Sequence, residues 1–251
     1  MPAKPIRAVA RALDVLEALN RQGTATALVL ARETGIPRPT VYRLLETLVG
    51  TGHVAAVGER YTLRLRVRAL SDGFEDEAWI AEIAAPALLA LTARIRWPCD
   101  VGTLEGTEMV IRETTHGVAP FSIDRAMLGR RLPLLESSMG RAWLAFCPAG
   151  ERAALLRMLG APLGFARRLG EVRRRGYALR AGGVLWPHTG SVAVPITSGG
   201  RLLGCINAIW MARAVPAEEG IRQCLEPLRE TRDGIEAAIA RAQAAAQKGE
   251  T

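Results

Sequence analysis

The chain has 251 residues, a formal net charge of +8 and 49% hydrophobic residues, so it is long enough for one or two domains with a packed core. It has no run of about eighteen uncharged apolar residues and begins without the apolar stretch of a secretion signal, so we expect a cytoplasmic protein without membrane spans. Four widely spaced cysteines and three histidines fit neither a disulfide framework nor a metal site, and we expect no cofactor.

The first helical pattern lies in residues 6–20. Val9, Ala12, Leu13 and Leu16 recur at the spacing of one helix face. An apolar face of this kind is normally buried against other elements. We therefore predict that these four side chains form the core-facing side of the first helix in a three-helix core.

The most informative segment, residues 26–48, has the layout of a helix-turn-helix, a motif that places one helix in the major groove of DNA. Thr24 or Thr26 can cap a short helix, because a hydroxyl accepts hydrogen bonds from the free amides of a first turn. Gly35 follows at the point where a helix is expected to end in a left-handed residue. Pro37 then suits the beginning of the next helix.

The second helix of this motif is predicted to be amphipathic. Its apolar residues recur at i, i+3, i+4 and i+7 and form one buried stripe, made of Val41, Leu44, Leu45 and Leu48. The other side carries residues that can meet phosphates and base edges, namely Arg38, Pro39, Thr40, Tyr42 and Arg43. The alternative interpretation is an ordinary helix hairpin at the surface.

The next residues, 53–63, favour a DNA-binding module over that alternative. Two short β-like runs flank Gly58, which predicts a two-stranded wing, and Arg60 lies near its tip, where it can reach a phosphate. The charge distribution agrees, because residues 1–68 hold 11 Lys and Arg against 5 Asp and Glu, a net +6 of the chain's +8. A basic cluster on one module is typical of a surface that binds phosphates.

Two helical patterns follow the wing, at residues 65–74 and 75–96. The first is charged on one side and is predicted to be a connector. We therefore place a domain boundary near Ser71 to Phe74. It separates a winged helix-turn-helix domain in residues 1–70 from a linker helix and a second domain in residues 71–251.

The second domain is predicted to pack helices on an antiparallel sheet, an α+β arrangement. Its strands are expected in hairpins around Gly106 and around residues 198–201, in weaker runs at residues 121–127 and from Gly129, and at Tyr177. Its helices are expected at residues 137–147, 151–159, 166–176 and 216–245.

Four stretches are informative together: ETGIPRPTVYRLLETL, GHVAAVGERYTL, RRLPLLESSMGRAWLAF and GSVAVPITSGGRLLGCI. They resemble the IclR family of bacterial transcriptional regulators, and the resemblance covers nearly the whole chain. Runs such as RETTH, GRRLPLL and WLAFCP are most similar to the family's hydroxyphenylpropionate-pathway activator type. The resemblance implies a winged helix-turn-helix, a linker helix and a GAF-like effector-binding domain. It also implies dimers or tetramers that bind palindromic operators in double-stranded DNA.

The resemblance also implies an effector site. In that family the ligand's carboxylate meets the turn into the helix after the Pro-Leu strand, which here is Ser138, Met139 and Gly140. Free amides and the positive end of a helix attract an anion, and glycine allows close approach. Gly140 can instead serve only the packing of the helix. On the final hairpin, the family's ligand-binding positions correspond to Ser191 and Asn207.

Two candidates also follow from the residues themselves. Asn207 lies in an apolar strand, and a buried amide there needs a partner, which can be a ligand or a backbone carbonyl. Arg112 can bind a carboxylate with two hydrogen bonds, or it can form a surface ion pair with Glu113 or Glu108. We count both residues among the effector-binding candidates.

Three functions are compared. We expect a ligand-responsive transcriptional regulator whose effector is a small carboxylate. An aromatic acid and an aromatic-acid catabolic operon are favoured, and a short aliphatic carboxylate is the alternative. A nucleic-acid-binding protein without a ligand is disfavoured by the well-formed second domain. An enzyme is disfavoured because the chain has no P-loop, no nucleophile elbow and no dinucleotide-binding fingerprint.

Overall fold

The structure, a computed structural model, describes residues 6–70 and 79–249. The chain divides into two compact units, residues 1–75 and 76–251, and each has its own hydrophobic core. The boundary predicted near Ser71 to Phe74 lies outside the described residues, and so does part of the two helical patterns predicted around it.

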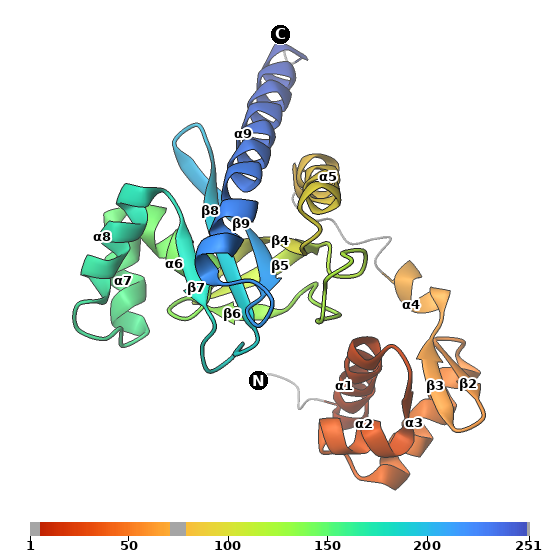
Figure 1. Ribbon diagram of the computed structural model, residues 1–251. Coiled ribbons are helices and arrows are strands. Elements are labelled where there is room, and N and C mark those ends of the chain that lie inside the picture. The colour runs from red at the N-terminus through yellow and green to blue at the C-terminus, as the bar shows by residue number, and fades with distance from the viewer. Residues whose placement is uncertain (1–5, 71–78, 250–251) are drawn as a thin grey trace, which may run out of the picture. The chain divides into compact units, whose positions relative to one another are not determined.

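The N-terminal unit consists of three helices, a small sheet and a short fourth helix, coloured red to orange in Figure 1. Its elements in chain order are α1 (Arg7–Gln22), β1 (Ala25–Thr26), α2 (Ala27–Thr34), α3 (Arg38–Gly50), β2 (Val54–Val57), β3 (Arg60–Leu63) and α4 (Leu65–Ala69). The strands pair antiparallel in the order β1-β3-β2. The predicted helix-turn-helix therefore consists of α2 and α3, and the predicted wing consists of β2 and β3.

The local signals at the helix-turn-helix are confirmed. Thr26 caps α2, because its hydroxyl accepts a hydrogen bond from the amide of Val29 at 3.4 Å. Gly35 ends the same helix in the left-handed conformation, with a φ of 68°. Pro39 lies in the first turn of α3, where a missing amide hydrogen costs no helical bond. These local features direct the chain from one helix into the next.

The predicted core face of α1 is only partly correct, because Leu16 packs against the core of this unit but Val9 and Leu13 are exposed. Val15, Ala18 and Leu19 are the buried residues of this helix, whereas Val9 and Leu13 are 55% and 54% exposed. Both sets have helical spacing, so periodicity alone does not choose between them. The buried set shares a core with the apolar stripe of α3, so the packing of the helices determines which face of α1 is covered.

The second unit is built on a six-stranded antiparallel sheet. Its strands are β4 (Cys99–Glu105), β5 (Glu108–Thr114), β6 (Arg131–Pro133), β7 (Ala178–Ala181), β8 (Thr189–Ser198) and β9 (Arg201–Met211). Their order across the sheet is β6-β5-β4-β9-β8-β7. The predicted hairpin of β8 and β9 is confirmed, and its turn residues Gly199 and Gly200 have φ angles of 55° and 78°.

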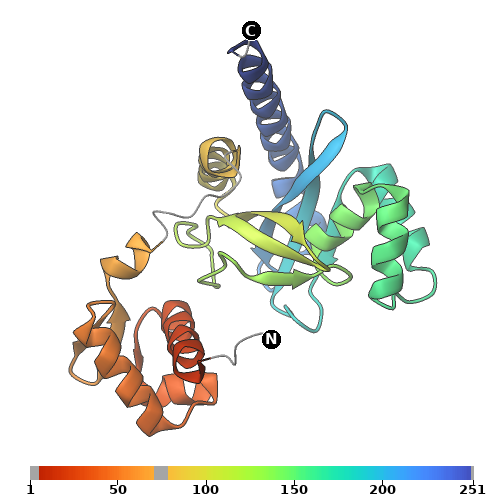
Figure 2. The ribbon, with the colours of Figure 1, turned by 180° about the vertical axis from the view of Figure 1, so that it is seen from behind.

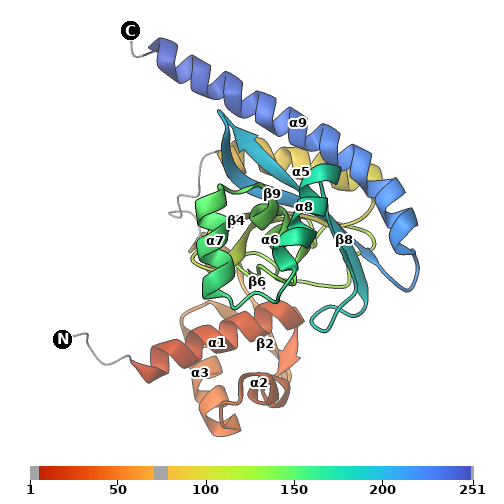
Figure 3. The ribbon, with the colours of Figure 1, turned by 90° about the vertical axis from the view of Figure 1, so that its left-hand side faces the viewer.

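Helices cover both faces of this sheet, as the views in Figures 2 and 3 show. One face carries α6 (Ser138–Phe146), α7 (Ala149–Met158) and α8 (Phe165–Arg175), and the other carries η1 (Ile80–Ala84), α5 (Ala85–Ile95) and α9 (Ala217–Gly249). Alternate side chains of β9 point to opposite faces of the sheet and belong to different cores. Cys205 packs on the α6 side and Ile206 on the α9 side. None of the helices in the described ranges is long and apolar enough to cross a membrane.

Residues 115–130, between β5 and β6, form an irregular segment that we name the strap. The strand predicted at residues 121–127 is therefore wrong. Phe121 and Ile123 suggested an alternating strand, but their side chains are 46% and 54% exposed. The strap instead contributes side chains to a cavity on the α6 side of the sheet.

Candidate functional site

Helix α3 presents polar side chains to the solvent. Arg38, Pro39, Tyr42 and Arg43 are exposed, and Thr40 is half-buried. Arg38 lies over the ring of Tyr42, with 5.4 Å between its guanidinium carbon and the ring centre, and its Nη2 donates to the phenolic oxygen at 3.0 Å. A stacked guanidinium is held in place and keeps further donors free for phosphates or base edges.

The remaining predicted DNA-binding residue lies on the wing. Arg60 is the first residue of β3 and pairs with Val57 across the turn at Gly58 and Glu59. Its side chain is exposed. The wing and the second helix of such a motif are the elements that approach DNA.

A small cavity lies on the α6 face of the sheet in the second unit. Its volume is about 30 Å³, roughly the share of one or two water molecules. The sheet contributes Thr189 and four further polar side chains to its wall, namely Asp100, Arg180, Ser191 and Asn207. The N-terminus of α6 contributes Ser137 and Ser138, the strap contributes His116, Asp124 and Met127, and the loop of residues 182–188 contributes Trp186.

The four polar sheet residues form a row that crosses adjacent strands. Asp100 on β4 pairs with Asn207 on β9, and Ser191 on β8 pairs with Arg180 on β7. Asn207 pairs with Ala193, two residues from Ser191, so all four side chains lie on the same face. Each is at most 6% exposed. Because polar groups in an apolar sheet cost free energy unless they are bonded, their partners indicate what the cavity can bind.

Arg180 has a buried guanidinium group that lacks an acidic partner. Its Nη1 donates to the carbonyls of Gly182, Trp186 and Thr189, at 3.3, 3.1 and 2.7 Å, and its Nη2 donates to the hydroxyl of Thr189 at 2.8 Å. Among the described residues all these acceptors are neutral, and no carboxylate forms an ion pair with it. Burial lowers the pKa of Arg180 to about 10, and the charge of Arg141 acts in the same direction, whereas Asp124, which lines the same cavity, opposes the decrease.

The N-terminus of α6 borders the same cavity. Ser137 caps the helix, and its hydroxyl accepts from the amide of Gly140 at 3.0 Å. The amides of Ser138 and Met139 have no acceptor within the helix. A Cβ atom on Gly140 would lie 2.3 Å from the Cα of Leu134, so this glycine is required by close packing of the helix. The packing alternative for Gly140 is thus favoured over an approach of the ligand to its amide.

Of the other predicted effector residues, Ser138, Ser191 and Asn207 line the cavity and Met139 does not. Ser138 and Ser191 meet in the cavity wall, with 2.8 Å between their hydroxyl oxygens. Asn207 is also there, but its Oδ1 accepts from the backbone amide of Asp100 at 3.0 Å, so its partner is an amide hydrogen and not the carbonyl we considered. Met139 is fully buried in the core beneath α6.

Arg112 lies away from this cavity. Its Nε donates to the hydroxyl of Thr103 at 2.9 Å, and its Nη2 forms an ion pair with Glu105 at 3.1 Å. The ion-pair alternative therefore applies to Arg112, although the partner is neither Glu113 nor Glu108. A guanidinium that is already paired has little need of a ligand's carboxylate.

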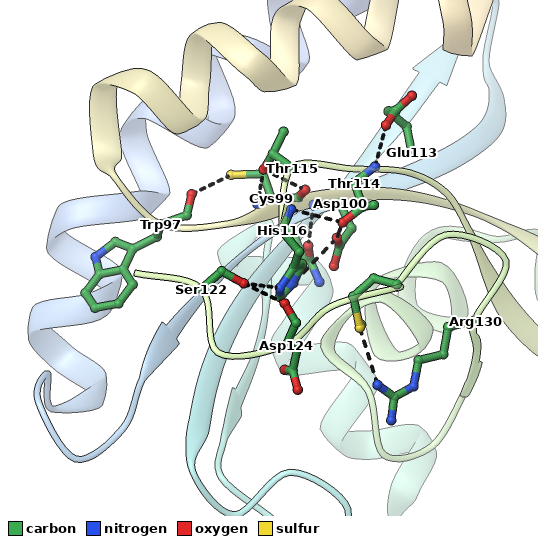
Figure 4. Close-up of polar contacts among 12 residues, drawn as sticks. Trp97, Cys99, Asp100, Glu113, Thr114, Thr115, His116, Ser122, Asp124 and Arg130 are labelled. Carbon is green, nitrogen blue, oxygen red and sulfur yellow. Dashed lines mark hydrogen bonds and ion pairs between the residues drawn. The ribbon is translucent and has the colours of Figure 1, made fainter. Parts of the chain in front are cut away.

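The strap brings a histidine over the Asp100 end of the row, as Figure 4 shows. His116 is 5% exposed, and its Nδ1 lies 2.7 Å from the hydroxyl oxygen of Ser122. Its Nε2 lies 3.7 Å from Oδ1 of Asp100. That carboxylate also accepts from the hydroxyl of Thr114 at 2.6 Å. Burial raises the pKa of Asp100, and the nearby His116 and Thr114 oppose the increase.

Arg180, Asp100 and His116 were missed in the sequence. Arg180 is a single arginine in a short strand, and nothing local distinguishes it from a surface residue. His116 and Asp100 are far apart in the chain and meet only through the pairing of β4 with β5. Among the described residues, no group of histidine, cysteine and acidic side chains is arranged to hold a metal ion.

The family of the chain follows from comparison with known proteins. The IclR helix-turn-helix domain matches residues 8–58, and the C-terminal domain of the bacterial transcriptional regulator IclR matches residues 75–237. The chain belongs to the IclR family of transcriptional regulators. Its second match covers most of the effector-binding unit, cavity included. Proteins of this family are regulators and not enzymes, which confirms our expectation from the sequence.

Individual relatives agree with this assignment. The Pca regulon regulatory protein of Pseudomonas putida is 28% identical over 229 residues, which is 82% of this chain and 78% of that protein. The IclR of Thermotoga maritima has a TM-score of 0.68 at 21% identity, with 93% of this chain and 99% of that chain covered. An IclR homologue of Microbacterium hydrocarbonoxydans, in complex with 4-hydroxybenzoate, has a TM-score of 0.64 at 24% identity, with coverage of 94% and 99%. The last two likenesses establish the fold.

Proposed function

We propose that this IclR-family regulator responds to a small carboxylate with an aromatic ring and controls an operon for the catabolism of aromatic acids. Residues 1–70 bind DNA in this proposal, and residues 71–251 bind the effector and hold the protomers together. A single recognition helix and wing cover one half-site, so a dimer or tetramer binds a palindromic operator.

DNA binding is assigned to the exposed residues of α3 and the wing. Arg38, Thr40, Tyr42 and Arg43 act from the helix, with Pro39 in its first turn, and Arg60 contacts a phosphate from the wing. The exposure of these side chains and the excess of positive charge in residues 1–68 support the assignment.

The observation that carries the effector proposal is the buried guanidinium of Arg180, which forms no ion pair with a carboxylate of the described residues. A charge taken out of water is costly unless an opposite charge compensates it. A ligand carboxylate in the cavity supplies that charge, and guanidinium binds carboxylate with two parallel hydrogen bonds. Ser137 and Ser138 at the N-terminus of α6 also line the cavity, and the positive end of the helix adds to the attraction.

Entry of an aromatic acid requires the cavity to enlarge, because about 30 Å³ is too small for a ring. The sheet and α6 are regular and packed, whereas the strap and the loop of residues 182–188 are irregular. Two adjacent glycines, Gly182 and Gly183, have positive φ angles of 74° and 132° in this loop. We infer that these two segments move outward to admit the ligand.

An aromatic ring is favoured by the apolar part of the wall, which Met127, Leu132, Trp186 and Ile209 provide. The 4-hydroxybenzoate held by the Microbacterium homologue is an acid of this class. A short aliphatic carboxylate is the second candidate, because the present volume suits a small molecule better. Both candidates use the same carboxylate contacts.

The test is calorimetry of the full-length protein with benzoate, 3-phenylpropionate and pyruvate, together with the uncharged amides of the two aromatic acids. Arg180→Gln removes the charge and is expected to weaken binding of the acid by roughly ten- to a hundredfold, since hydrogen bonds to charged groups contribute about 1.5–3 kcal/mol. Arg112→Gln is the matched control, because Arg112 is already paired with Glu105 outside the cavity.

Equal losses in the two variants would refute the role of Arg180. Equal affinities for acid and amide would remove the carboxylate site altogether. Binding of pyruvate with no binding of either aromatic acid would select the aliphatic alternative.

A further inference from the structure

His116 contains a polar atom that is buried without a partner. The residue is 5% exposed and lines the cavity. Among buried side-chain nitrogen and oxygen atoms of the described residues, its Nε2 is the one that makes no hydrogen bond. Such atoms are rare in folded proteins, because each loses its bonds to water without replacement. The position of this atom in a ligand cavity indicates that the missing partner comes from the ligand.

The other nitrogen of the ring identifies where the proton lies. The hydroxyl of Ser122 has one hydrogen and donates it to the carbonyl of Asp124 at 2.9 Å. It therefore accepts from His116, so Nδ1 carries a hydrogen in the 2.7 Å contact between them. In a neutral ring Nε2 is then a bare acceptor, and in a charged ring it is a second donor. In both states it lacks a bond.

Asp100 faces the same space. Its Oδ1 is 3.7 Å from Nε2 of His116, which is too long for a hydrogen bond. The carboxylate has hydrogen bonds with the side chains of Thr114 and Asn207, and its two oxygens can accept more than these two. A hydroxyl suits this pair, because its hydrogen can be donated to the carboxylate or to a bare Nε2, and its oxygen can accept from Nε2 when that atom carries a hydrogen.

This pair lies at the opposite end of the polar row from Arg180. Asp100 is on β4 and Arg180 is on β7, with β9 and β8 between them. Three interstrand spacings separate the two ends by roughly 14 Å of sheet, and the long arginine side chain spans part of that distance. A ligand can therefore contact both ends only if a spacer of sufficient length separates its two polar groups.

We propose that His116 and Asp100 form a hydroxyl-recognition subsite, which makes the protein selective for hydroxylated aromatic acids. This inference rests on the proposed function, since Arg180 and α6 fix the carboxylate. A second carboxylate is disfavoured at this end, because two carboxyl groups at one buried site oppose each other's ionisation. An ammonium group donates but does not accept, so, unlike a hydroxyl, it cannot bond an Nε2 that carries a hydrogen.

The experiment measures the ratio of affinities between a hydroxylated acid and its parent acid, which we call the hydroxyl preference. Calorimetry compares benzoate with 3- and 4-hydroxybenzoate, and 3-phenylpropionate with its 3-hydroxyphenyl counterpart. The wild-type protein is expected to bind a hydroxylated acid roughly ten- to a hundredfold more tightly than its parent. His116→Phe keeps a ring of similar size without Nε2, and it is expected to abolish this preference while affinity for the parent acid stays within about threefold.

Two further variants complete the design. His188→Phe is the matched control, because this histidine is exposed and does not line the cavity, and it should keep the wild-type preference. Asp100→Asn keeps the shape of the acid and should also reduce the preference, so the proposal stays testable if His116→Phe does not fold.

The outcomes separate this inference from the proposed function. If both acids of a pair bind the wild type equally and Arg180→Gln weakens both, the carboxylate site stands and the hydroxyl subsite is refuted. A preference that survives in both His116→Phe and Asp100→Asn refutes it as well, and a water molecule is then the partner of Nε2. Binding of short aliphatic acids alone, or of no acid, overturns the subsite together with the aromatic proposal.

Discussion

Gly140→Ala tests the packing of α6, which positions the N-terminus that borders the cavity. The new Cβ atom would lie 2.3, 2.4 and 2.7 Å from the Cα, O and C atoms of Leu134. These are backbone atoms in the turn after β6, so no flexible side chain can yield. The start of α6 must therefore move away by about 1 Å to restore ordinary contact, taken as 3.4 Å or more.

The size of the effect follows from two opposing terms. Overpacking of this kind costs about 1–3 kcal/mol, and alanine in a helix recovers about 0.5–1 kcal/mol relative to glycine. The net destabilisation is about 1–2 kcal/mol, which corresponds to a decrease in Tm of roughly 3–8 °C for a domain of this size. Affinity for the effector should fall as well, because the amides of Ser138 and Met139 move with the helix.

Gly170→Ala is the matched control. Gly170 lies inside α8, and the nearest atom to its added Cβ would be the end of the Arg174 side chain at 4.0 Å. This variant is expected to raise Tm by about 1–4 °C through helix propensity alone. Thermal unfolding followed by circular dichroism measures both changes. A Gly140→Ala protein that is as stable as Gly170→Ala would refute the close packing against Leu134.

Two predictions concern other parts of the chain. The double variant Arg38→Ala/Arg43→Ala is expected to weaken operator binding at least tenfold, at about 1–3 kcal/mol per base contact, with unchanged Tm; wild-type gel shifts would contradict it. The cysteines are buried, and burial raises the pKa of Cys147 to about 11 and that of Cys224 to about 12. A disulfide reagent at pH 8 should therefore label thiols only on unfolding, and rapid labelling of the native protein would argue against this burial.

The parts of the fold that could be predicted from the sequence are those that local chemistry determines. Thr26 and Gly35 fix the ends of α2 with groups from the same few residues. The Gly199-Gly200 turn likewise defines the β8–β9 hairpin through its own dihedral angles. The face of α1 could not be predicted this way. Val9 and Leu13 have the same spacing as the buried set, and only contacts with other helices separate the two.

The candidate site was predicted only in part, for a similar reason. Ser138, Ser191 and Asn207 were named from the family resemblance, and all three line the cavity. The burial of Arg180 depends on its register with Ser191 on β8, and no sequence signal reveals that pairing. Arg112 was equally plausible as a carboxylate ligand, but Glu105 on the neighbouring strand pairs with it. For both arginines, the pairing of strands determines which groups surround the side chain.

The polar row also explains how ligand binding can change the state of the protein. Arg180 donates to the carbonyls of Gly182 and Trp186 in the loop, and Nδ1 of His116 donates to Ser122 in the strap. The groups assigned to the ligand are thus the same groups that hold the two segments proposed to move when the ligand enters. A ligand shifts a conformational equilibrium only by its difference in affinity between the states. A hydroxylated acid that engages both ends competes with or reinforces these contacts, and so its binding free energy acts directly on the strap and the loop.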